Sequence, residues 1–369
     1  MKQGWEYKKI GTICNITTGK LDANAANEDG LYPFFTCSRI PLSINTYAYD
    51  CECILIAGNG DLNVKYYNGK FNAYQRTYIL QLKNDVNGVE MRYIFAFFNL
   101  YIEELRRKSI GGIIKYIKLG DLTNALLPLP DITTQLTIVS ELDKINELIR
   151  LKQEQLKDYD NLAQSIFYEM FGDPVENEKG WEVKKIGEIG SVERGAGISK
   201  KDFVEDGLPC IHYGQLHTIL GARTKKHYTS IPHDLLPKYK VAHTGDLVMA
   251  ITSEDVEGSC KSTAWLGNYD VIVGSDAAIL HHEQDGTFLS YYTMTKAFYN
   301  EKAKYAKGFK VTHISTKEIE KISVFLPPLP LQHLFAQRIE QIERQKSAVQ
   351  KSITDLETLL ASRMQYWFE

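Results

Sequence analysis

A large internal repeat constrains the fold of this chain more than any other feature. Residues 4–11 (Gly-Trp-Glu-Tyr-Lys-Lys-Ile-Gly) recur as residues 180–187 (Gly-Trp-Glu-Val-Lys-Lys-Ile-Gly), 176 positions later, with seven of the eight identical. A second set of matches, 197 positions apart, closes each half of the chain. Because repeats of this kind mark duplicated structural units, we predict two related domains. The second set pairs Ile117, Leu122, Leu129, Pro130, Ile132 and Gln135 with Ile314, Ile319, Leu326, Pro327, Leu329 and Gln332.

The segments between these matches are unlike each other, and the second is longer by 21 residues. A shared frame around different interiors suggests one scaffold that presents two different recognition surfaces. We therefore divide the chain into a first lobe (1–130), a first long helix (131–172), a second lobe (173–327) and a second long helix (328–369).

A long helical pattern follows the Pro-rich strip at the end of each lobe. Proline is tolerated just before a helix or in its first turn, and neither pattern contains an internal Pro or Gly. Apolar residues recur with alternating spacings of four and three over more than four heptads, which indicates a coiled-coil seam. The first helix should stop before Gly172 and Pro174. The seam positions are Ile138, Leu142, Ile145, Ile149, Lys152, Leu156, Tyr159, Ala163, Ile166 and Met170, then Phe335, Ile339, Ile342, Lys346, Val349, Ile353, Leu356, Leu360, Arg363 and Trp367.

One narrow apolar stripe on each helix suits the pairing of two helices. The second lobe lies between the helices in the chain, so the chain can return and pair them antiparallel. The expected fold is α+β: two β-rich lobes, each followed by a long helix, with the helices forming an antiparallel coiled coil of pseudo-two-fold symmetry. The alternative is that each helix packs only on its own lobe, although a helix of roughly 35 residues is about 50 Å long and exceeds a lobe of this size.

Both lobes are predicted to be mostly β with short helices. In the first lobe we expect strands at 53–57, 64–67 and 78–82, turns at 58–61 and 68–69, and a helix over 91–107. In the second we expect a turn and strand over 245–251, strands at 271–273 and 277–280, and a helix over 289–306.

Polar side chains near these turns are the candidate DNA contacts. Loops on a rigid β scaffold commonly carry function, and Arg, Lys, Asn and Gln can bond to base edges. The candidates are Arg39, Asn59, Lys65, Gln75, Arg76 and Lys115 in the first lobe, and His212, Tyr213, Gln215, Arg223, Lys225, Lys226, Ser253, Lys261, Lys307 and Lys310 in the second.

No motif for catalysis is visible in the sequence. It lacks a P-loop, a Gly-x-Gly-x-x-Gly fingerprint and a His-Glu-x-x-His pair, so we predict no catalytic, cofactor or metal site. The six cysteines are scattered without a Cys-x-x-Cys pair and are interpreted as plain thiols. No apolar run could cross a bilayer and the start lacks a signal peptide, so we expect a cytoplasmic protein.

The charge balance argues against an autonomous DNA binder. The net charge is −3, whereas such proteins are usually basic. The first lobe is mildly basic, with 15 Lys and Arg against 12 Asp and Glu in residues 1–130. A DNA role therefore requires local basic patches or partners that share the phosphate contacts.

The whole arrangement resembles the specificity (S) subunit of type I restriction-modification enzymes. The resemblance rests on a Gly-Trp-Glu-x-x-x-Ile-Gly opening, a variable β-rich lobe, a Leu-Pro-rich strip ending in Gln and a long helix, all occurring twice. Residues 326–332 (Leu-Pro-Pro-Leu-Pro-Leu-Gln) are close to the family pattern, and residues 129–135 (Leu-Pro-Asp-Ile-Thr-Thr-Gln) match it more loosely.

This resemblance implies a non-catalytic DNA-binding subunit. Each lobe would be a target recognition domain that reads half of a bipartite double-stranded DNA site, and the helices would set the spacing and dock two methyltransferase (M) subunits. The M subunits would use S-adenosylmethionine to methylate adenine, and ATP-dependent restriction/motor (R) subunits would join them for cleavage, so that S-adenosylmethionine, ATP and Mg would belong to these partners. Two rivals are a fused restriction or modification enzyme, for which no motif is visible, and a coiled-coil scaffold protein that binds other macromolecules, which does not explain two different interiors within one frame.

Overall fold

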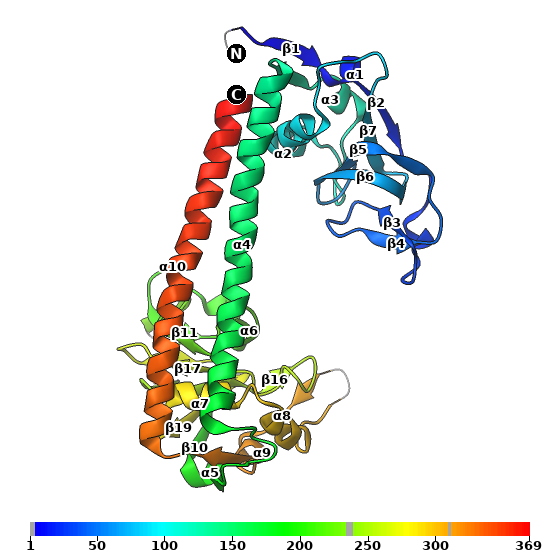
Figure 1. Cartoon of the computed structure of the whole chain (residues 1–369). Helices are drawn as coiled ribbons and strands as arrows, with labels where there is room; N and C mark the ends of the chain where they lie inside the picture. The colour runs from blue at the N-terminus through cyan, green and yellow to red at the C-terminus, as the bar shows by residue number, and fades with distance from the viewer. Residues whose placement is uncertain (1–3, 234–238, 309–310) are drawn as a thin grey trace. The chain divides into compact units, whose positions relative to one another are not determined.

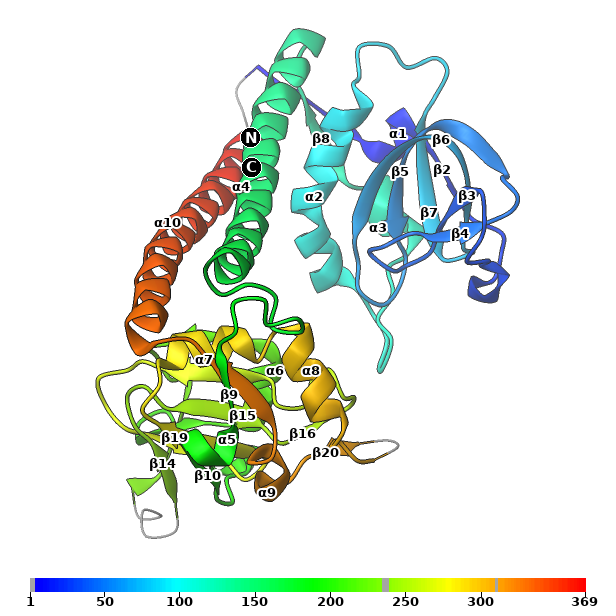
Figure 2. The ribbon, with the colours of Figure 1, turned by 60° about the horizontal axis from the view of Figure 1, so that its bottom comes forward.

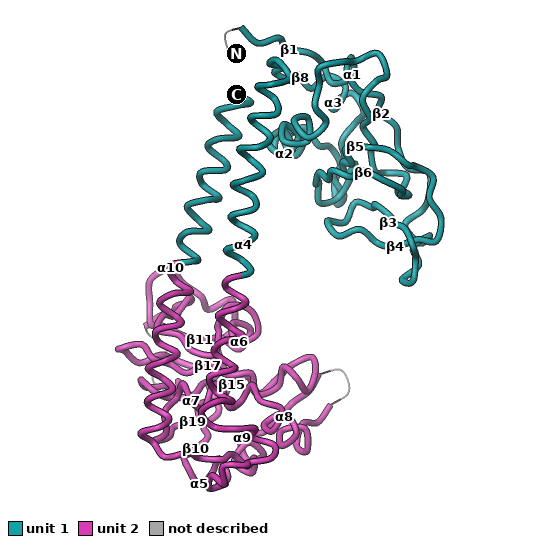
Figure 3. The backbone as a smooth tube through the Cα atoms, viewed as in Figure 1, with its two compact units in different colours: residues 1–154, 349–369 teal, residues 155–348 magenta. Residues whose placement is uncertain are grey.

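The computed structural model describes residues 4–233, 239–308 and 311–369 (Figure 1). The chain separates into two compact units (Figure 3): unit 1 comprises Met1–Glu154 and Val349–Glu369, and unit 2 comprises Gln155–Ala348. The two longest helices, α4 (Ile132–Phe171) and α10 (Leu329–Phe368), each contribute residues to both units. Within the described ranges, no helix is long and apolar enough to span a membrane.

Unit 1 is built on a six-stranded sheet with the order β2-β7-β5-β6-β3-β4. Its helix α2 lies against one face of this sheet (Figure 2). The elements before α4 are β1 (Glu6–Lys9), α1 (Ile10–Ile13), β2 (Cys14–Thr18), η1 (Ala23–Ala25), β3 (Tyr32–Phe35), β4 (Leu42–Ile44), β5 (Tyr49–Ala57), β6 (Val64–Ala73), β7 (Thr77–Leu82), α2 (Met91–Lys108), α3 (Leu119–Thr123) and β8 (Leu126–Leu129).

The central strand β5 supplies the core on both faces of this sheet. Ile54 and Ile56 belong to the cluster that includes the apolar face of α2, whereas Cys53 and Leu55 belong to a smaller cluster on the other face. Side chains alternate between the two faces of a strand, so an uninterrupted apolar run is what a strand covered on both sides requires.

One predicted turn of unit 1 is wrong. Asn68 and Gly69 lie inside β6, opposite Glu52 and Cys51 of β5, and not between two strands. The strand β5 begins earlier than predicted, at Tyr49, so β6 keeps a hydrogen-bonding partner past this dipeptide.

Unit 2 has a sheet whose first four strands correspond to those of unit 1, in the order β10-β19-β15-β17-β12. A second sheet has the order β13-β11-β18-β14, and in it β11 pairs antiparallel with β13 and parallel with β18, as β3 pairs with β4 and β6 in unit 1. The elements are β9 (Glu182–Lys185), α5 (Ile186–Ile189), β10 (Gly190–Arg194), η2 (Lys200–Asp202), β11 (Leu208–Ile211), α6 (Tyr213–Thr218), β12 (Arg223–Thr224), β13 (Thr229–Ile231), β14 (Lys240–Ala242), β15 (Leu247–Ala250), β16 (Thr252–Ser253), β17 (Ser262–Trp265), β18 (Val271–Val273), β19 (Ala277–His282), α7 (Gly286–Tyr292), α8 (Lys296–Ala303), β20 (Thr312–His313), α9 (Thr316–Ile319) and β21 (Ser323–Leu326).

The single helix predicted over 289–306 is also wrong, because two helices, α7 and α8, occupy this stretch. The break follows from Thr295, whose hydroxyl accepts a hydrogen bond from the N–H of Phe298 and caps α8. Threonine competes for backbone groups in this way and therefore favours the start of a new helix over the interior of an old one.

The repeated sequence segments meet each other in space. In unit 1, Glu6 of β1 pairs with Leu129 of β8, and in unit 2 Glu182 of β9 pairs with Leu326 of β21. Each lobe is therefore closed by a two-stranded sheet made from its own beginning and end, which explains why both ends of the repeat match while the interiors differ.

The repeated glutamine that follows each strip is fully buried. Gln135 accepts a hydrogen bond from the N–H of Glu90 (2.9 Å) and donates to the carbonyls of Gly88 (2.9 Å) and Pro130 (2.8 Å). Gln332 likewise accepts from the N–H of Asp285 (3.0 Å) and donates to the carbonyl of Pro327 (2.8 Å) and to Gln284 Oε1 (2.9 Å). Each glutamine thus fastens the start of a long helix to the lobe before it.

Segments of α4 and α10 contact each other within each unit. In unit 1, Glu141 of α4 accepts hydrogen bonds from Arg363 Nη2 (3.1 Å) and Trp367 Nε1 (2.9 Å) of α10. In unit 2, Lys346 of α10 donates to Asp160 of α4 (2.7 Å). Every seam residue named in the sequence analysis is buried or partly buried, and none is exposed.

The end of α4 agrees with its predicted cap. The helix ends at Phe171, and Gly172 follows with a φ of 77°. The Gly172 N–H donates to the Tyr168 carbonyl at 2.8 Å, the left-handed glycine termination expected of such a sequence.

Candidate nucleic-acid interface

Five of the six candidate residues of unit 1 lie on loops that are bonded to one another, and Lys65 lies in β6. The Gly58 N–H donates to the Arg76 carbonyl (2.8 Å), and the Gly60 N–H donates to the Lys115 carbonyl (3.0 Å). Asn63 Nδ2 donates to the Cys37 carbonyl at 2.8 Å. The turn after β5 thus ties together the loops that carry Arg39, Asn59, Gln75, Arg76 and Lys115.

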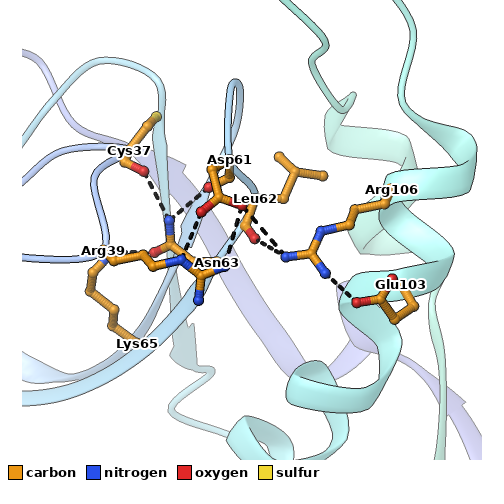
Figure 4. Close-up of polar contacts among 8 residues, drawn as sticks. All are labelled: Cys37, Arg39, Asp61, Leu62, Asn63, Lys65, Glu103 and Arg106. Atoms are coloured by element: carbon orange, nitrogen blue, oxygen red, sulfur yellow. Dashed lines mark hydrogen bonds and ion pairs between the residues drawn. The ribbon is translucent and has the colours of Figure 1, made fainter. Parts of the chain in front are cut away.

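An ion-pair cluster orients the exposed Arg39 (Figure 4). Its Nε lies 2.7 Å from Asp61 Oδ2, and its Nη2 lies 3.4 Å from Asp61 Oδ1. Arg106, at the end of α2, donates to the Leu62 carbonyl (2.8 Å) and lies 3.6 Å from Asp61 Oδ1. The hydrogen bond from Arg39 holds the pKa of Asp61 below its ordinary value. A guanidinium held by one edge keeps its other donors available to an external acceptor.

Lys65 completes this cluster from the side of β6. Its ammonium donates to Asn63 Oδ1, and burial lowers its pKa from the usual lysine value. Gln75 and Arg76 are both exposed in the turn before β7. The structure therefore gathers the six candidates of the first lobe around one turn, and adds Arg106, which the sequence reasoning missed.

The loops of unit 2 follow the same plan. Ile251 of unit 2 takes the place of Gly58 of unit 1, and its N–H donates to the Asp276 carbonyl (3.0 Å). The Ile251 carbonyl accepts from the Ile314 N–H (3.0 Å), and the Gly58 carbonyl accepts in the same way from the Ile117 N–H (3.0 Å). A cleft of about 1370 Å³ lies beside these loops, with the predicted Tyr213, Ser253 and Lys261 in its lining. The lining also contains three lysines that were not predicted, Lys200, Lys296 and Lys302.

Two candidates of unit 2 hold the local backbone. His212 caps α6 by accepting from the Gly214 N–H (3.2 Å), and burial lowers its pKa. Gln215 accepts from the His212 N–H (3.0 Å) and donates to Thr229 Oγ1 (3.2 Å). These bonds position Tyr213 at the start of the helix, beside the cleft.

Three further candidates lie on the loop around β12. Arg223 and Lys225 both contact the Glu340 carboxylate of α10, with Lys225 Nζ at 2.9 Å. Arg223 has only 9% of its side chain exposed, against 58% for Lys225. The Lys226 N–H donates to Thr224 Oγ1 at 3.2 Å. Arg223 therefore fastens this loop to the helix, whereas Lys225 keeps most of its side chain in solvent.

The last two candidates, Lys307 and Lys310, follow α8 in the sequence. Lys310 lies outside the described residues, whereas Lys307 Nζ lies 2.7 Å from Glu318 Oε1. The hydrogen bonds from Lys307 and from the N–H and hydroxyl of Ser315 lower the pKa of Glu318 to about 2. The Lys307 side chain is 76% exposed and is accessible in spite of this pair.

This lowered pKa predicts a dependence of stability on pH. Glu318 binds its proton more weakly in the folded chain than in the unfolded chain, where its pKa is near 4.5. Its contribution is therefore full above pH 4.5 and is lost as the pH falls towards about 2. We expect Glu318→Gln to show a smaller decrease in melting temperature between pH 5 and pH 3 than the wild type. Glu283→Gln, at an exposed position, is the control; an unchanged decrease in Glu318→Gln would contradict the assignment.

The cysteines and acidic residues suggest no further chemistry. Burial raises the pKa of the Cys14 and Cys260 thiols to about 12, which keeps them protonated and weakly nucleophilic. Among the residues that the structure describes, no group of three or more His, Cys, Asp or Glu side chains is placed to hold a metal ion.

Comparison with known proteins assigns most of the chain to one family. A family model described as "Type I restriction modification DNA specificity domain" matches residues 2–158 and 178–358. The EcoDI specificity subunit of a type I restriction enzyme from Escherichia coli is 26% identical, and the match covers 95% of this chain and 84% of that protein. The MjaVIII specificity subunit from Methanocaldococcus jannaschii is 23% identical, with 97% and 92% covered.

Solved structures share the fold. The S subunit of a type I restriction-modification system from M. genitalium aligns with a TM-score of 0.57 and 13% identity, covering 100% of this chain and 98% of that chain. A chain from a structure concerned with complex assembly and conformational transition of the type I R-M system aligns with a TM-score of 0.59 and 18% identity, covering 99% and 97%.

Proposed function

This chain belongs to the type I restriction-modification DNA specificity family, and we propose that its two lobes read the two halves of an asymmetric, bipartite site in double-stranded DNA. The observation that carries this proposal is the pair of equivalent loop clusters with different contents. The same backbone bonds join Gly58 to Arg76 in unit 1 and Ile251 to Asp276 in unit 2. One scaffold that presents different side chains at matching positions is suited to reading two different sequences.

The lobes 1–130 and 173–327 are the two target recognition domains in this proposal, and 131–172 and 328–369 are the spacer helices. We infer that the helices pair as an antiparallel coiled coil with pseudo-two-fold symmetry. The contacts of Glu141 with Arg363 and of Asp160 with Lys346 support this pairing, since residue numbers rise along one helix as they fall along the other. A paired-helix spacer of fixed length would hold the two readers at a set number of base pairs.

The catalytic work is assigned to partners. We propose that the helices dock two methyltransferase subunits and that restriction/motor subunits join them, so that S-adenosylmethionine, ATP and Mg are bound by those subunits and not by this chain. The modest charge of the chain fits a complex in which several subunits share the phosphate contacts.

Exchange of one lobe tests the assignment. We replace residues 190–313 with the corresponding segment of the EcoDI specificity subunit and map methylated adenines in the host genome by single-molecule sequencing. The expected result is a new sequence in one half of the methylated motif, with the other half and the spacer length unchanged, because each lobe reads independently.

The matched control exchanges residues 14–116 and should alter the opposite half. A motif that is unchanged by both exchanges would reject DNA reading by the lobes and favour a scaffold role. Methyl transfer by the purified chain alone would reject the non-catalytic assignment.

A further inference from the structure

Each unit carries a short hairpin at an equivalent place. In unit 1, Ile110 and Tyr116 exchange backbone hydrogen bonds of 3.0 and 2.8 Å, and in unit 2, 197 positions later, Lys307 and His313 exchange bonds of 3.1 and 2.8 Å. We call residues 110–116 the first hairpin and the described residues 307–308 and 311–313 the second hairpin.

A glycine occupies the second position of both hairpins. Gly111 and Gly308 have φ values of 120° and 126°. A Cβ on Gly111 would lie 2.5 Å from the Ile114 carbonyl oxygen. Both the backbone conformation and the close approach therefore require glycine, and the hairpin is a feature of the shared frame.

Both hairpins are joined to the turn that follows the central strand of the sheet. Asn59 forms a bridge with Tyr116 in unit 1, and Thr252 of β16 pairs with His313 of β20 in unit 2. The first hairpin is therefore bonded to the same turn as Arg39, which contacts Asp61, and Arg76, whose carbonyl accepts from the Gly58 N–H. The second contributes Val311 to the cleft that Lys261 and Ser253 line.

The tip of the first hairpin is apolar and exposed. Ile113 is 104% exposed and Ile114 is 62% exposed, with the exposed Lys115 next to them. Val311 of the second hairpin is 55% exposed. Leaving two neighbouring isoleucines in water forgoes the free energy that their burial would provide, so a ligand that covers the tip would gain it.

We propose that Ile113 and Ile114 enter a groove of the DNA and contact the bases directly. The surrounding cations select this occupant, since lysine and arginine side chains attract the phosphates on both sides of a groove. Apolar side chains at such a place contact thymine methyl groups or enter base steps. This inference rests on the proposed function, and it adds an apolar contact with the bases to the polar candidate contacts.

The test compares specific with non-specific DNA affinity. The chain is purified with the methyltransferase subunits of its host. The dissociation constant is then measured for a duplex that carries the methylated motif mapped in the host genome, here called the selected site, and for a scrambled duplex. We expect Ile113→Ser/Ile114→Ser to weaken the specific complex roughly 10- to 100-fold, as loss of one or two base contacts does. Affinity for the scrambled duplex should not change, and Ile113→Val/Ile114→Val should retain most of the specific affinity.

Salt dependence separates this role from a phosphate contact. The serine variant should leave the slope of log K against log salt unchanged, whereas Lys115→Met should reduce its magnitude by about 0.9. Leu31→Ser, at an apolar side chain of unit 1 that is 81% exposed, is the matched control and should bind as the wild type does.

The outcomes are distinguishable. A wild-type complex that does not prefer any duplex would reject the proposed function itself. A serine variant that binds the selected site as tightly as the wild type, or that loses affinity equally for both duplexes, would overturn the hairpin inference alone. Since both side chains are exposed, the serine variant should melt at the wild-type temperature, which confirms that a loss of binding is not a loss of folding.

Discussion

Replacement of Phe335 by alanine is expected to lower the free energy of unfolding of unit 2 by about 3–5 kcal/mol. The Phe335 side chain is fully buried, and its ring centroid lies 5.6 Å from that of Phe167, 5.4 Å from that of Phe171 and 5.3 Å from that of Tyr291. Alanine would leave a cavity between α4, α7 and α10 that these surrounding rings cannot refill without leaving their edge-to-face contacts.

Hydrogen exchange read by mass spectrometry is the appropriate measurement, because it reports on the two units separately. Exchange should accelerate in unit 2 and remain unchanged in residues 4–108 of unit 1. Leu334→Ala is the control: this neighbour on the same helix is 43% exposed, and its loss should cost less than about 1 kcal/mol. Equal effects of the two substitutions would contradict the packing role given to Phe335.

The buried glutamines should give the second large effect. Gln135→Leu and Gln332→Leu keep the approximate size of the side chain but remove its hydrogen bonds to the lobe. In Gln135→Leu the Glu90 N–H and the Gly88 and Pro130 carbonyls lose their partner. Each stranded group costs about 1–3 kcal/mol where water cannot reach it, and burial of the apolar leucine offsets about 1.5–3 kcal/mol of the total. We therefore expect a net loss of about 2–5 kcal/mol in each variant.

The effect of each glutamine should be confined to its own unit. Chemical denaturation followed by hydrogen exchange should show unit 1 weakened by Gln135→Leu and unit 2 by Gln332→Leu. Gln153→Leu makes the same chemical change at an exposed position of α4 and should be close to neutral. If it destabilised the chain as much as Gln135→Leu does, the loss could not be attributed to the buried hydrogen bonds.

The frame of the molecule was readable from the sequence because its signals are local or repeated. The 4,3 spacing and the Pro and Gly at the ends predicted two long helices, and the structure has α4 (Ile132–Phe171) and α10 (Leu329–Phe368). The repeat indicated two related lobes, and their framing strands pair in the same register. The repeat did not predict the buried role of Gln135 and Gln332, because a match between two copies shows that a residue is shared and not which groups it bonds to.

The candidate interface was less readable because its geometry depends on contacts distant in the chain. Arg106 has nothing in its local sequence that distinguishes it from Arg107 and Lys108, which also end α2 and favour its C-terminal dipole. Only the fold places Arg106 beside Asp61. In the same way, the ion pair that fastens Arg223 to Glu340 joins residues 117 positions apart. Turn composition indicated the loops, but it did not indicate which of their side chains form ion pairs or hydrogen bonds within the chain.

The membership of Val349–Glu369 in unit 1 has a consequence for the order in which the chain folds during synthesis. Trp367 stacks on Trp5 with ring centroids 6.3 Å apart, and Phe368 packs on Tyr93 at 5.2 Å. The domain that is translated first therefore cannot complete its core until residues 349–369 leave the ribosome, whereas the domain translated second, which ends at Ala348, can close before them. During synthesis, the apolar side chains of unit 1 that residues 349–369 cover stay exposed to solvent after unit 2 has folded. This reverses the usual N-to-C order of domain folding.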